Sequence, residues 1–599
     1  MSLDQVWLNV KEIALLCIFL SSCYWLIWKA PTSVEGGSNL NNYCFSGHLP
    51  IVLNNVTGVP EGGNGEGEPT LTLPSSYESC AGFPDFNGDG YADLAIGAPD
   101  ENIGSVLTFS DAGAVHVIYG KTTGLEAVSA SALLDDQVFD RTVEGLNSLT
   151  MGEGDSFGQA LAYGDFNQDG FDDLAIGVPG SLVDGLDAAG AVHVIYGSRH
   201  GLTPEDAQDW TQESTAVDST AEEDDQFGFS LVGGDFDGDG FDDLAIGTPN
   251  ENIGGALDAG SVNIIFGTSL GLRTTVNLAQ GVGKNDEWVT QDLLSGNSSE
   301  SNDQFGYSLT KGDFNQDGFD DLVVGVPFED NFLLGLGNAG VVNIFYGSSE
   351  GVIQSGNNAS TQEIYANSDG VDNLIEENDQ FGFSLAAADF DGNGFDDLAI
   401  GVPYESHGTG GSLIQNAGAV NIVFSSVDGS GLDPSTGAPI LHQGLTGVQS
   451  DPSAFEFFGW DLVAADFNND GFVDLGVGVP FDQILGVQIG STHIFYSDVS
   501  GPATVGDEQI FDPDNPEVND GFGFAVTAVD ANGDSYIDLV VGSNNDDPIN
   551  IPNDNTGSVF IFYSDSSGVS LVSNENFYQG YNGVAGASET NDRFGAVLP

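Results

Sequence analysis

The sequence predicts an all-β fold, a seven-bladed β-propeller with four-stranded blades. A nine-residue acidic motif occurs seven times, at intervals of 64 to 80 residues. A short apolar run follows each copy, and a Phe-Gly pair precedes every copy except the first. Repeats of this length that each contain several short strand signals are typical of a propeller with one sheet per repeat.

The third repeat shows the order of the predicted elements. Its Phe-Gly pair at 227–228 lies in the segment 225–231, which comes before the acidic motif 235–243. An apolar run bounded by Gly follows, as in a buried strand. After a Gly-Thr-Pro step and a polar loop, residues 259–267 alternate apolar and polar side chains, which indicates a half-buried strand. The more variable segment around 288–291 supplies the fourth strand.

Each acidic motif has the composition of a Ca²⁺ loop. In the second copy, Asp165, Asn167 and Asp169 provide side-chain oxygens at alternate positions, and a Gly stands at the sixth position, where the chain must turn sharply. The backbone carbonyl of Phe171 and the carboxylate of Asp173 complete the set. Ca²⁺ takes six to eight oxygen ligands at about 2.3–2.6 Å. An EF-hand is excluded because its loop needs a Glu at position twelve and a following helix, whereas an apolar strand follows here.

The predicted ligands occupy positions one, three, five, seven and nine of each copy, with position seven acting through its carbonyl. They are Asp85, Asn87, Asp89, Tyr91, Asp93, Asp165, Asn167, Asp169, Phe171, Asp173, Asp235, Asp237, Asp239, Phe241, Asp243, Asp313, Asn315, Asp317, Phe319, Asp321, Asp389, Asp391, Asn393, Phe395, Asp397, Asp466, Asn468, Asp470, Phe472, Asp474, Asp530, Asn532, Asp534, Tyr536 and Asp538. Up to seven structural Ca²⁺ ions are therefore predicted. Surface turns rich in Asp and Gly are the alternative, but they do not explain seven copies with the same oxygen positions. The seventh copy has Ser535 where the others have Gly, so we expect it to be the weakest site.

The Phe-Gly pairs and the acidic motifs are offset by one repeat. The first motif has no pair before it, and the last pair, Phe594-Gly595, has no motif after it. This offset predicts that the C-terminal strand completes the first blade, which would leave no exposed sheet edge on the ring. A truncated eighth repeat is the alternative.

These motifs are those of the FG-GAP repeat. Over residues 77–599 the chain resembles the propeller of integrin α-chains and its bacterial relatives. The resemblance implies that the Ca²⁺ loops lie on one face of the disc and that inter-blade loops on the other face are available to a partner. The chain departs from integrin α-chains because all seven repeats carry a cation loop and because neither a stalk nor a C-terminal membrane helix follows the repeats.

The first 76 residues precede the predicted propeller. Within residues 1–30, the apolar segment 13–28 is shorter than a spanning helix of about 20 residues and longer than an ordinary signal-peptide core. A signal-anchor, a lipoprotein signal at Cys23 and a cleaved signal peptide all remain open, and each places the rest of the chain outside the cytoplasm. Residues 31–76 are rich in Gly, Asn, Pro and Ser, which predicts a flexible tether. Cys44 and Cys80 can form one disulfide in an oxidising compartment.

Charge and motif content limit the function. The chain has 91 acidic and nine basic residues and a formal net charge of −82. Nucleic acid is excluded as a partner because phosphate neutralisation needs Lys and Arg. Three of the seven histidines, His116, His193 and His493, fill a strand position that other repeats fill with Asn, which indicates a structural role. Because no nucleophile elbow, phosphate-binding loop or zinc spacing is present, we expect no enzyme.

The combined expectation is a Ca²⁺-binding propeller, secreted or anchored at the cell surface through its N-terminal segment. It would bind a protein or glycan through its inter-blade loops, in adhesion or surface recognition. Two alternatives are an extracellular polysaccharide hydrolase or lyase on a propeller scaffold and an assembly module of a surface complex.

Overall fold

The computed structural model describes most of the repeat region. The described residues are 83–104, 109–121, 124–125, 136–147, 149, 151–215, 217–273, 286–294, 298–331, 334–353, 360–366, 368, 376–409, 412–436, 439–484, 486–503, 508–510, 517–548, 555–579, 584 and 591–599, all within the compact unit Phe45–Pro599. The predicted N-terminal segment, the tether and the pair Cys44 and Cys80 lie outside the described residues. Among the described residues, no helix is long and apolar enough to cross a membrane.

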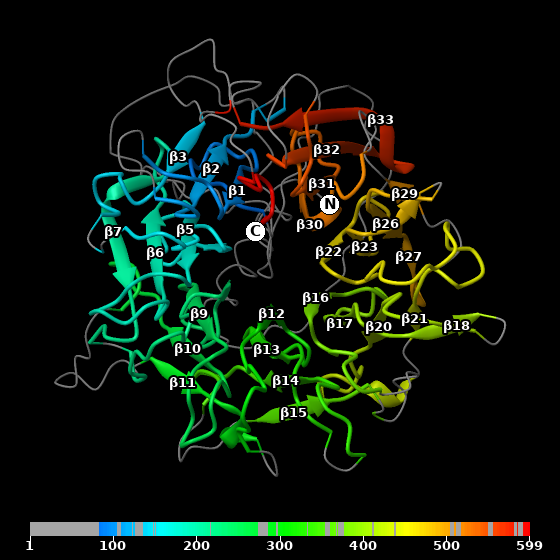
Figure 1. Ribbon diagram of the computed structural model, residues 1–599, viewed down its shortest axis with the longest axis horizontal. Coiled ribbons are helices and arrows are strands. Elements are labelled where there is room, and N and C mark those ends of the chain that lie inside the picture. The colour runs from blue at the N-terminus through cyan, green and yellow to red at the C-terminus, as the bar shows by residue number, and fades with distance from the viewer. Residues whose placement is uncertain are drawn as a thin grey trace, which may run out of the picture. The chain divides into compact units, whose positions relative to one another are not determined.

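The fold is an all-β, seven-bladed propeller of four-stranded antiparallel sheets, as the sequence predicts (Figure 1). The strands of the first three blades are β1 (Leu94–Ala98), β2 (Ala114–Ile118) and β3 (Gln137–Phe139); β4 (Ala160–Gly164), β5 (Asp173–Val178), β6 (Ala191–Tyr196) and β7 (Thr203–Trp210); and β8 (Ser230–Gly234), β9 (Asp243–Thr248), β10 (Ser261–Ile265) and β11 (Glu287–Val289). The fourth and fifth blades contain β12 (Ser308–Gly312), β13 (Asp321–Val326), β14 (Val341–Phe345) and β15 (Thr361–Ile364); and β16 (Ser384–Ala388), β17 (Asp397–Val402), β20 (Ala419–Val423) and β21 (Ile440–Leu441). The last two contain β22 (Leu462–Ala465), β23 (Asp474–Val479), β26 (Ser491–Phe495) and β29 (Glu508–Ile510); and β30 (Phe522–Val529), β31 (Asp538–Ser543), β32 (Ser558–Asp565) and β33 (Gly568–Phe577).

Short hairpins and 3₁₀ turns lie in the segments between the blade strands of the described residues. Three two-stranded hairpins are β18 (His407–Thr409) with β19 (Ser412–Ile414), β24 (Gln483–Ile484) with β25 (Val487–Gln488), and β27 (Ser497–Asp498) with β28 (Gly501–Pro502). The helical elements in the described residues are two 3₁₀ turns, η1 (Gln291–Leu293) and η2 (Pro434–Thr436).

The C-terminal segment completes the first blade, as predicted. The amide of Gly97 in β1 donates to the carbonyl of Val597 (2.9 Å), and the amide of Gly595 donates back to Gly97 (3.1 Å). In the seventh blade, the Thr527 hydroxyl donates to the carbonyl of Pro599 (2.7 Å). The alternative of a truncated eighth repeat is therefore wrong.

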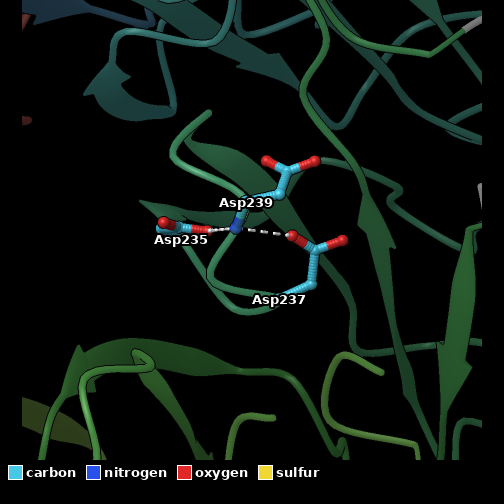
Figure 2. A group of neighbouring side chains, drawn as sticks. All are labelled: Asp235, Asp237 and Asp239. Carbon is cyan, nitrogen blue, oxygen red and sulfur yellow. Dashed lines mark hydrogen bonds between the residues drawn. The ribbon is translucent and has the colours of Figure 1, made fainter. Parts of the chain in front are cut away.

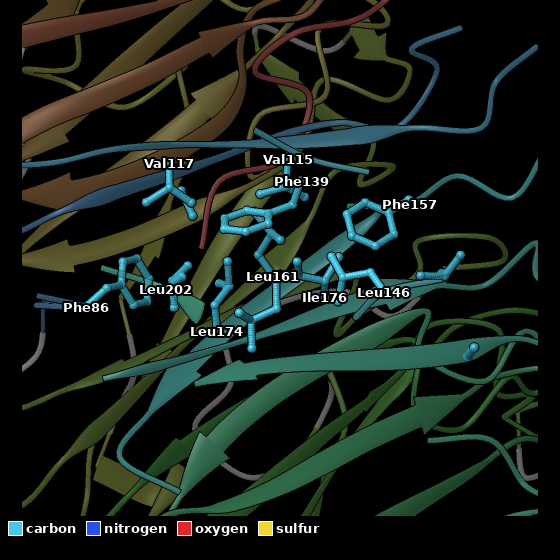
Figure 3. Packing of buried hydrophobic residues seen from close by; sticks show 14 of the residues in the cluster. Phe86, Val115, Val117, Phe139, Leu146, Phe157, Leu161, Leu174, Ile176 and Leu202 are labelled. Carbon is cyan, nitrogen blue, oxygen red and sulfur yellow. The ribbon is translucent and has the colours of Figure 1, made fainter. Parts of the chain in front are cut away.

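The hydrophobic cores lie between neighbouring blades. The core between the first two blades includes Phe139, Phe157 and Ile176 (Figure 3). The cluster that closes the ring packs residues of β1 and β2 against residues of β31, β32 and β33. Because each of the larger cores in the described residues joins two sheets, the blades bury their apolar faces against one another.

Each Phe-Gly pair joins one blade to the next. Phe227 is fully buried, and its amide donates to the carbonyl of Ala189 in the preceding blade (3.1 Å). Gly228 has a φ of 89°, and a Cβ there would lie 2.7 Å from the carbonyl oxygen of Ala191. Only Gly tolerates both the backbone conformation and this close approach.

The inner strands define two faces of the ring. Each runs from a Phe-Gly pair to an acidic loop, as β8 does from Gly228 to Asp235. We call the end with the acidic loops the acidic face and the end with the Phe-Gly pairs the Phe-Gly face. Loops between second and third strands lie on the Phe-Gly face because second strands run antiparallel to the inner ones.

Candidate metal centres

All seven acidic loops share one hydrogen-bond pattern. In the second loop, Asp165 accepts bonds from the amides of Asp169 (3.0 Å) and Gly170 (2.9 Å), and Asp169 accepts one from the amide of Phe171 (3.2 Å). The same three bonds recur in every copy at 2.8–3.2 Å. These bonds hold positions one and five in the same tight curl in all seven repeats.

The ninth residue anchors the loop to its blade. Asp173 is fully buried at the start of β5 and accepts bonds from the amides of Phe166 (3.1 Å) and Gly197 (2.8 Å). Burial raises the pKa of Asp173 well above its ordinary value and that of the equivalent Asp321 to about 8. A carboxylate oxygen has more than one acceptor site, so an amide bond leaves room for a cation. The sequence did not indicate this second, structural role of position nine.

Carboxylate oxygens converge in the third and fifth loops. In the third, oxygens of Asp235, Asp237 and Asp239 lie within 4.8 Å of one another, and the amide of Asp239 donates to both of the other side chains (Figure 2). In the fifth, Asp389, Asp391 and Asp397 converge in the same way. These are the two loops with Asp at position three. Such spacing suits a cation whose ligand oxygens each lie about 2.3–2.6 Å away.

Position three provides an independent test of the fit in four other loops. The side-chain oxygens of Asn87, Asn167, Asn468 and Asn532 are buried and have no hydrogen-bond partner. Leaving a buried acceptor without a partner costs about 1–3 kcal/mol. A hard cation would satisfy these oxygens, so the donor set fits Ca²⁺. In the fourth loop, Asn315 accepts a bond from the amide of Asp317 (2.9 Å).

The structure shows the backbone hydrogen bond of position seven and the backbone conformation of position six. The seventh residue donates its amide to position five in every loop, while its carbonyl remains a predicted ligand. At position six, the Gly residues have φ values of 86–93°, and Ser535 has a φ of 73°. The seventh loop therefore holds a residue with a Cβ in the left-handed region.

A row of aromatic rings lies on the Phe-Gly face, and its contacts were not predicted from the sequence. Its members follow five consecutive Phe-Gly pairs, and their neighbouring ring centroids are 5.0–5.5 Å apart. We define the aromatic belt as Phe229, Tyr307, Phe383, Trp460 and Phe524, all of which are half-buried. Gln159 and Ala596 fill the equivalent positions in the second and first blades and interrupt it. The sequence does contain a signal for this belt, because an aromatic residue follows five of the seven Phe-Gly pairs.

Exposed aliphatic side chains lie on the same face. Leu257, Leu334 and Leu413 are 54–63% exposed in the segments that connect second and third strands, with Leu413 in the hairpin strand β19. With the aromatic belt, they place apolar side chains on the Phe-Gly face, which also carries exposed acidic residues such as Asp184 and Asp187.

A second set of carboxyl groups is buried between the blades. At the junction of the second and third blades, Asp225 is 0% and Glu251 is 5% exposed, and the buried Gln212 donates to Glu251. Asp225 accepts a bond from the amide of Glu222 (2.5 Å). Burial raises the pKa of Asp225 to about 6 and, together with the charge of Asp225, that of Glu251 to about 8. Asp303, Glu329 and Gln291 repeat this arrangement at the next junction.

The polar position in the third strands is also buried. His116, His193 and His493 and their counterparts Asn263, Asn343 and Asn421 are at most 1% exposed. Asn263 donates to Asp286 (2.9 Å), and His193 contacts Asp209. This burial agrees with the structural role expected from the interchange of His and Asn.

Comparison with known proteins agrees with the repeat assignment. The family described as the FG-GAP repeat matches residues 81–118, 157–195, 227–264, 305–345 and 381–420. The chain carries FG-GAP repeats and is homologous to integrin α-chains. The sixth and seventh repeats lie outside the matched ranges, although their acidic loops make the same hydrogen bonds.

Two relatives show the extent of this similarity. Integrin alpha-PS2 of Drosophila melanogaster is 30% identical over 275 residues, which are 45% of this chain and 16% of that protein. Phosphatidylinositol-glycan-specific phospholipase D of Bos taurus is 33% identical over 194 residues, which are 32% of this chain and 21% of the relative. The chain thus spans about a fifth or less of the length of these relatives.

Among solved structures, the rhamnogalacturonan lyase PL11 of Bacillus licheniformis aligns with a TM-score of 0.32 and 12% identity. The alignment covers 80% of this chain and 73% of the lyase. This score is too low to support any functional conclusion.

Proposed function

We propose that this chain is a Ca²⁺-stabilised extracellular or cell-surface propeller that binds a protein or glycan through its Phe-Gly face, in adhesion or surface recognition. The observation that carries this proposal is that the acidic loops and the aromatic belt lie on opposite faces of the ring. One face holds the seven acidic loops, six of which have converging carboxylates or an unpartnered buried Asn oxygen that fit Ca²⁺, and the other holds the aromatic belt.

The acidic loops would hold the cation through positions one, three, five, seven and nine. Ca²⁺ supplies positive charge that offsets carboxylates held close together and satisfies buried oxygens such as that of Asn87. A site filled at 100 times its Kd would stabilise the fold by about 2.7 kcal/mol. Extracellular Ca²⁺ modules work with Kd values of about 10⁻⁴–10⁻³ M, which fits a chain outside the cytoplasm.

The Phe-Gly face offers what a binding surface needs. Aromatic side chains provide large contact areas and are enriched in protein interfaces. The belt rings are already packed against one another, so little conformational entropy would be lost on binding. Homology to integrin α-chains supports an adhesive role for the propeller.

The experiment that tests this proposal uses the full chain with immobilised glycans and matrix proteins, in Ca²⁺ and in EDTA. We expect a ligand that is captured only in Ca²⁺. Trp460→Ala should weaken its capture at least tenfold because Trp460 packs between Phe383 and Phe524. Trp288→Ala is the matched control because Trp288 lies in β11, outside the belt, and is 36% exposed.

Two outcomes would count against the proposal. If a correctly folded chain captured nothing across the panel, recognition would lose its support in favour of an assembly or hydrolytic role. If Trp460→Ala and Trp288→Ala behaved alike with a captured ligand, the aromatic belt would not be the binding surface.

A further inference from the structure

Four neighbouring pairs of acidic loops are joined by a direct side-chain bridge. In each pair, the Asp at position eight of one loop accepts a hydrogen bond from the amide of position one in the preceding loop. The four bonds are Asp85 to Asp172 (2.7 Å), Asp165 to Asp242 (2.8 Å), Asp235 to Asp320 (3.0 Å) and Asp313 to Asp396 (2.9 Å). Position eight, which is not among the predicted ligands, therefore links two predicted sites.

A backbone hydrogen bond runs in the opposite direction at the same four junctions. The amide of position eight donates to the carbonyl of position one in the preceding loop, as Asp242 does to Asp165 (3.3 Å). The other three bonds are 3.1–3.4 Å long. Each bridge thus has two hydrogen bonds. It connects position one, a predicted ligand, to position eight of the next loop, which lies between the predicted ligands at positions seven and nine.

The remaining three junctions have no carboxylate at position eight. Val473, Ile537 and Ala92 occupy that position in the sixth, seventh and first loops. The bridges therefore connect loops one to five in an unbroken series and leave loops six and seven outside it.

At three of the four bridges a Gly precedes the loop that donates the bond, whereas Pro84 precedes the first loop. Gly164 and Gly234 precede the second and third loops, and a Cβ at either position would lie 2.8 Å from the bridging oxygen of Asp242 or Asp320, respectively. Ala388 precedes the fifth loop, where the neighbouring position eight is Val473. Gly164 and Gly234 thus leave room for the bridging carboxylates of Asp242 and Asp320.

We propose that Asp172, Asp242, Asp320 and Asp396 are positioning residues that couple loops one to five into one cooperative Ca²⁺-binding array, while loops six and seven bind independently. The inference rests on the proposed Ca²⁺ binding. Positions seven and nine of a loop would be held in place when they bind a cation, and the Asp between them would be held with them. That Asp holds position one of the preceding loop in place, so the next cation has less backbone to order. The coupling is reciprocal because it is a difference in binding free energy.

The test is a Ca²⁺ titration of the full chain by calorimetry, with melting in EDTA as a separate measure of stability. We expect the wild type to show one cooperative phase with a Hill coefficient above one and a second phase of independent sites. Asp242→Ala divides the array and should lower the Hill coefficient toward one. It should also weaken binding in the adjoining loops by about fivefold or more.

Three variants separate coupling from general loss of structure. Asp242→Asn keeps an oxygen that can accept the bond from Asp165 and should restore cooperativity. Val473→Ala shortens the equivalent side chain at a junction without a bridge and should leave the titration unchanged. The double variant Val473→Asp with Ala388→Gly provides both the carboxylate and its space, and should add the sixth loop to the cooperative phase.

The outcomes distinguish the inference from the function on which it rests. If the wild type bound no Ca²⁺, both would fail. If it bound Ca²⁺ with a Hill coefficient of one, or if Asp242→Ala lowered only the melting temperature in EDTA, the cooperative array would be wrong and Ca²⁺ binding would stand.

Discussion

At the scale of single residues, the sixth position of each acidic loop depends on a left-handed backbone. Six loops place Gly there, and the seventh places Ser535 with a φ of 73°. The left-handed conformation costs a residue with a Cβ roughly 1–2 kcal/mol. The amide of Ser535 still donates to Asp530 (2.9 Å), so the loop keeps its hydrogen bonds in spite of this cost.

Replacement of this serine tests the contribution of backbone strain. Ser535→Gly should strengthen Ca²⁺ binding in the seventh loop by about fivefold to tenfold and raise the melting temperature, because the strain is removed. Calorimetric titration and thermal melting measure the two effects. Gly471→Ser is the matched reverse change in the sixth loop and should weaken binding by a similar factor. A Ser535→Gly variant that bound no better would show that position six does not limit the seventh site.

At the scale of elements, the junctions between blades hold buried carboxyl groups. Glu251 lies beside Asp225 and Gln212, and burial raises its pKa from 4.5 to about 8. A group whose pKa is raised on folding stabilises the fold fully below its unfolded pKa. This contribution is lost as the pH rises through the folded value. The junctions should therefore weaken between about pH 4.5 and 8.

Replacement of Glu251 by its neutral isostere tests this pH dependence. With Ca²⁺ at saturation, Glu251→Gln should melt at a higher temperature than the wild type at pH 8.5 and at nearly the same temperature at pH 5. A gain of about 1–2 kcal/mol at the higher pH is expected from its raised pKa. Glu205→Gln, on the exposed side of β7, should have no effect at either pH. If the difference in melting temperature between Glu251→Gln and the wild type stayed constant with pH, the raised pKa of Glu251 would be wrong.

At the scale of the whole molecule, the sequence predicted the features that repeat along the chain. Seven acidic motifs gave the number of blades, and the offset of Phe594-Gly595 gave the closure that the bonds of Gly97 confirm. The order of signals within one repeat also located the strands, because hydrophobic alternation is a local property.

Contacts between repeats could not be predicted in this way. Asp172 and Asp173 are adjacent in sequence, yet one contacts the preceding loop and the other its own blade. The aromatic belt has a similar origin, since Tyr307 and Phe383 meet only after two blades pack together. Which side chains meet depends on the register and spacing of neighbouring sheets, and one repeat taken alone does not contain that information.

The measurement that tests the central claim most directly is the number of Ca²⁺ ions bound per chain. The full chain would be stripped with EDTA, dialysed against Ca²⁺ and analysed by atomic emission, with a melting curve recorded on each sample. We predict up to seven ions per chain at saturation and a melting temperature that rises by many degrees when they bind. A folded chain that retained no Ca²⁺ and melted at the same temperature in EDTA would contradict the assignment of all seven loops.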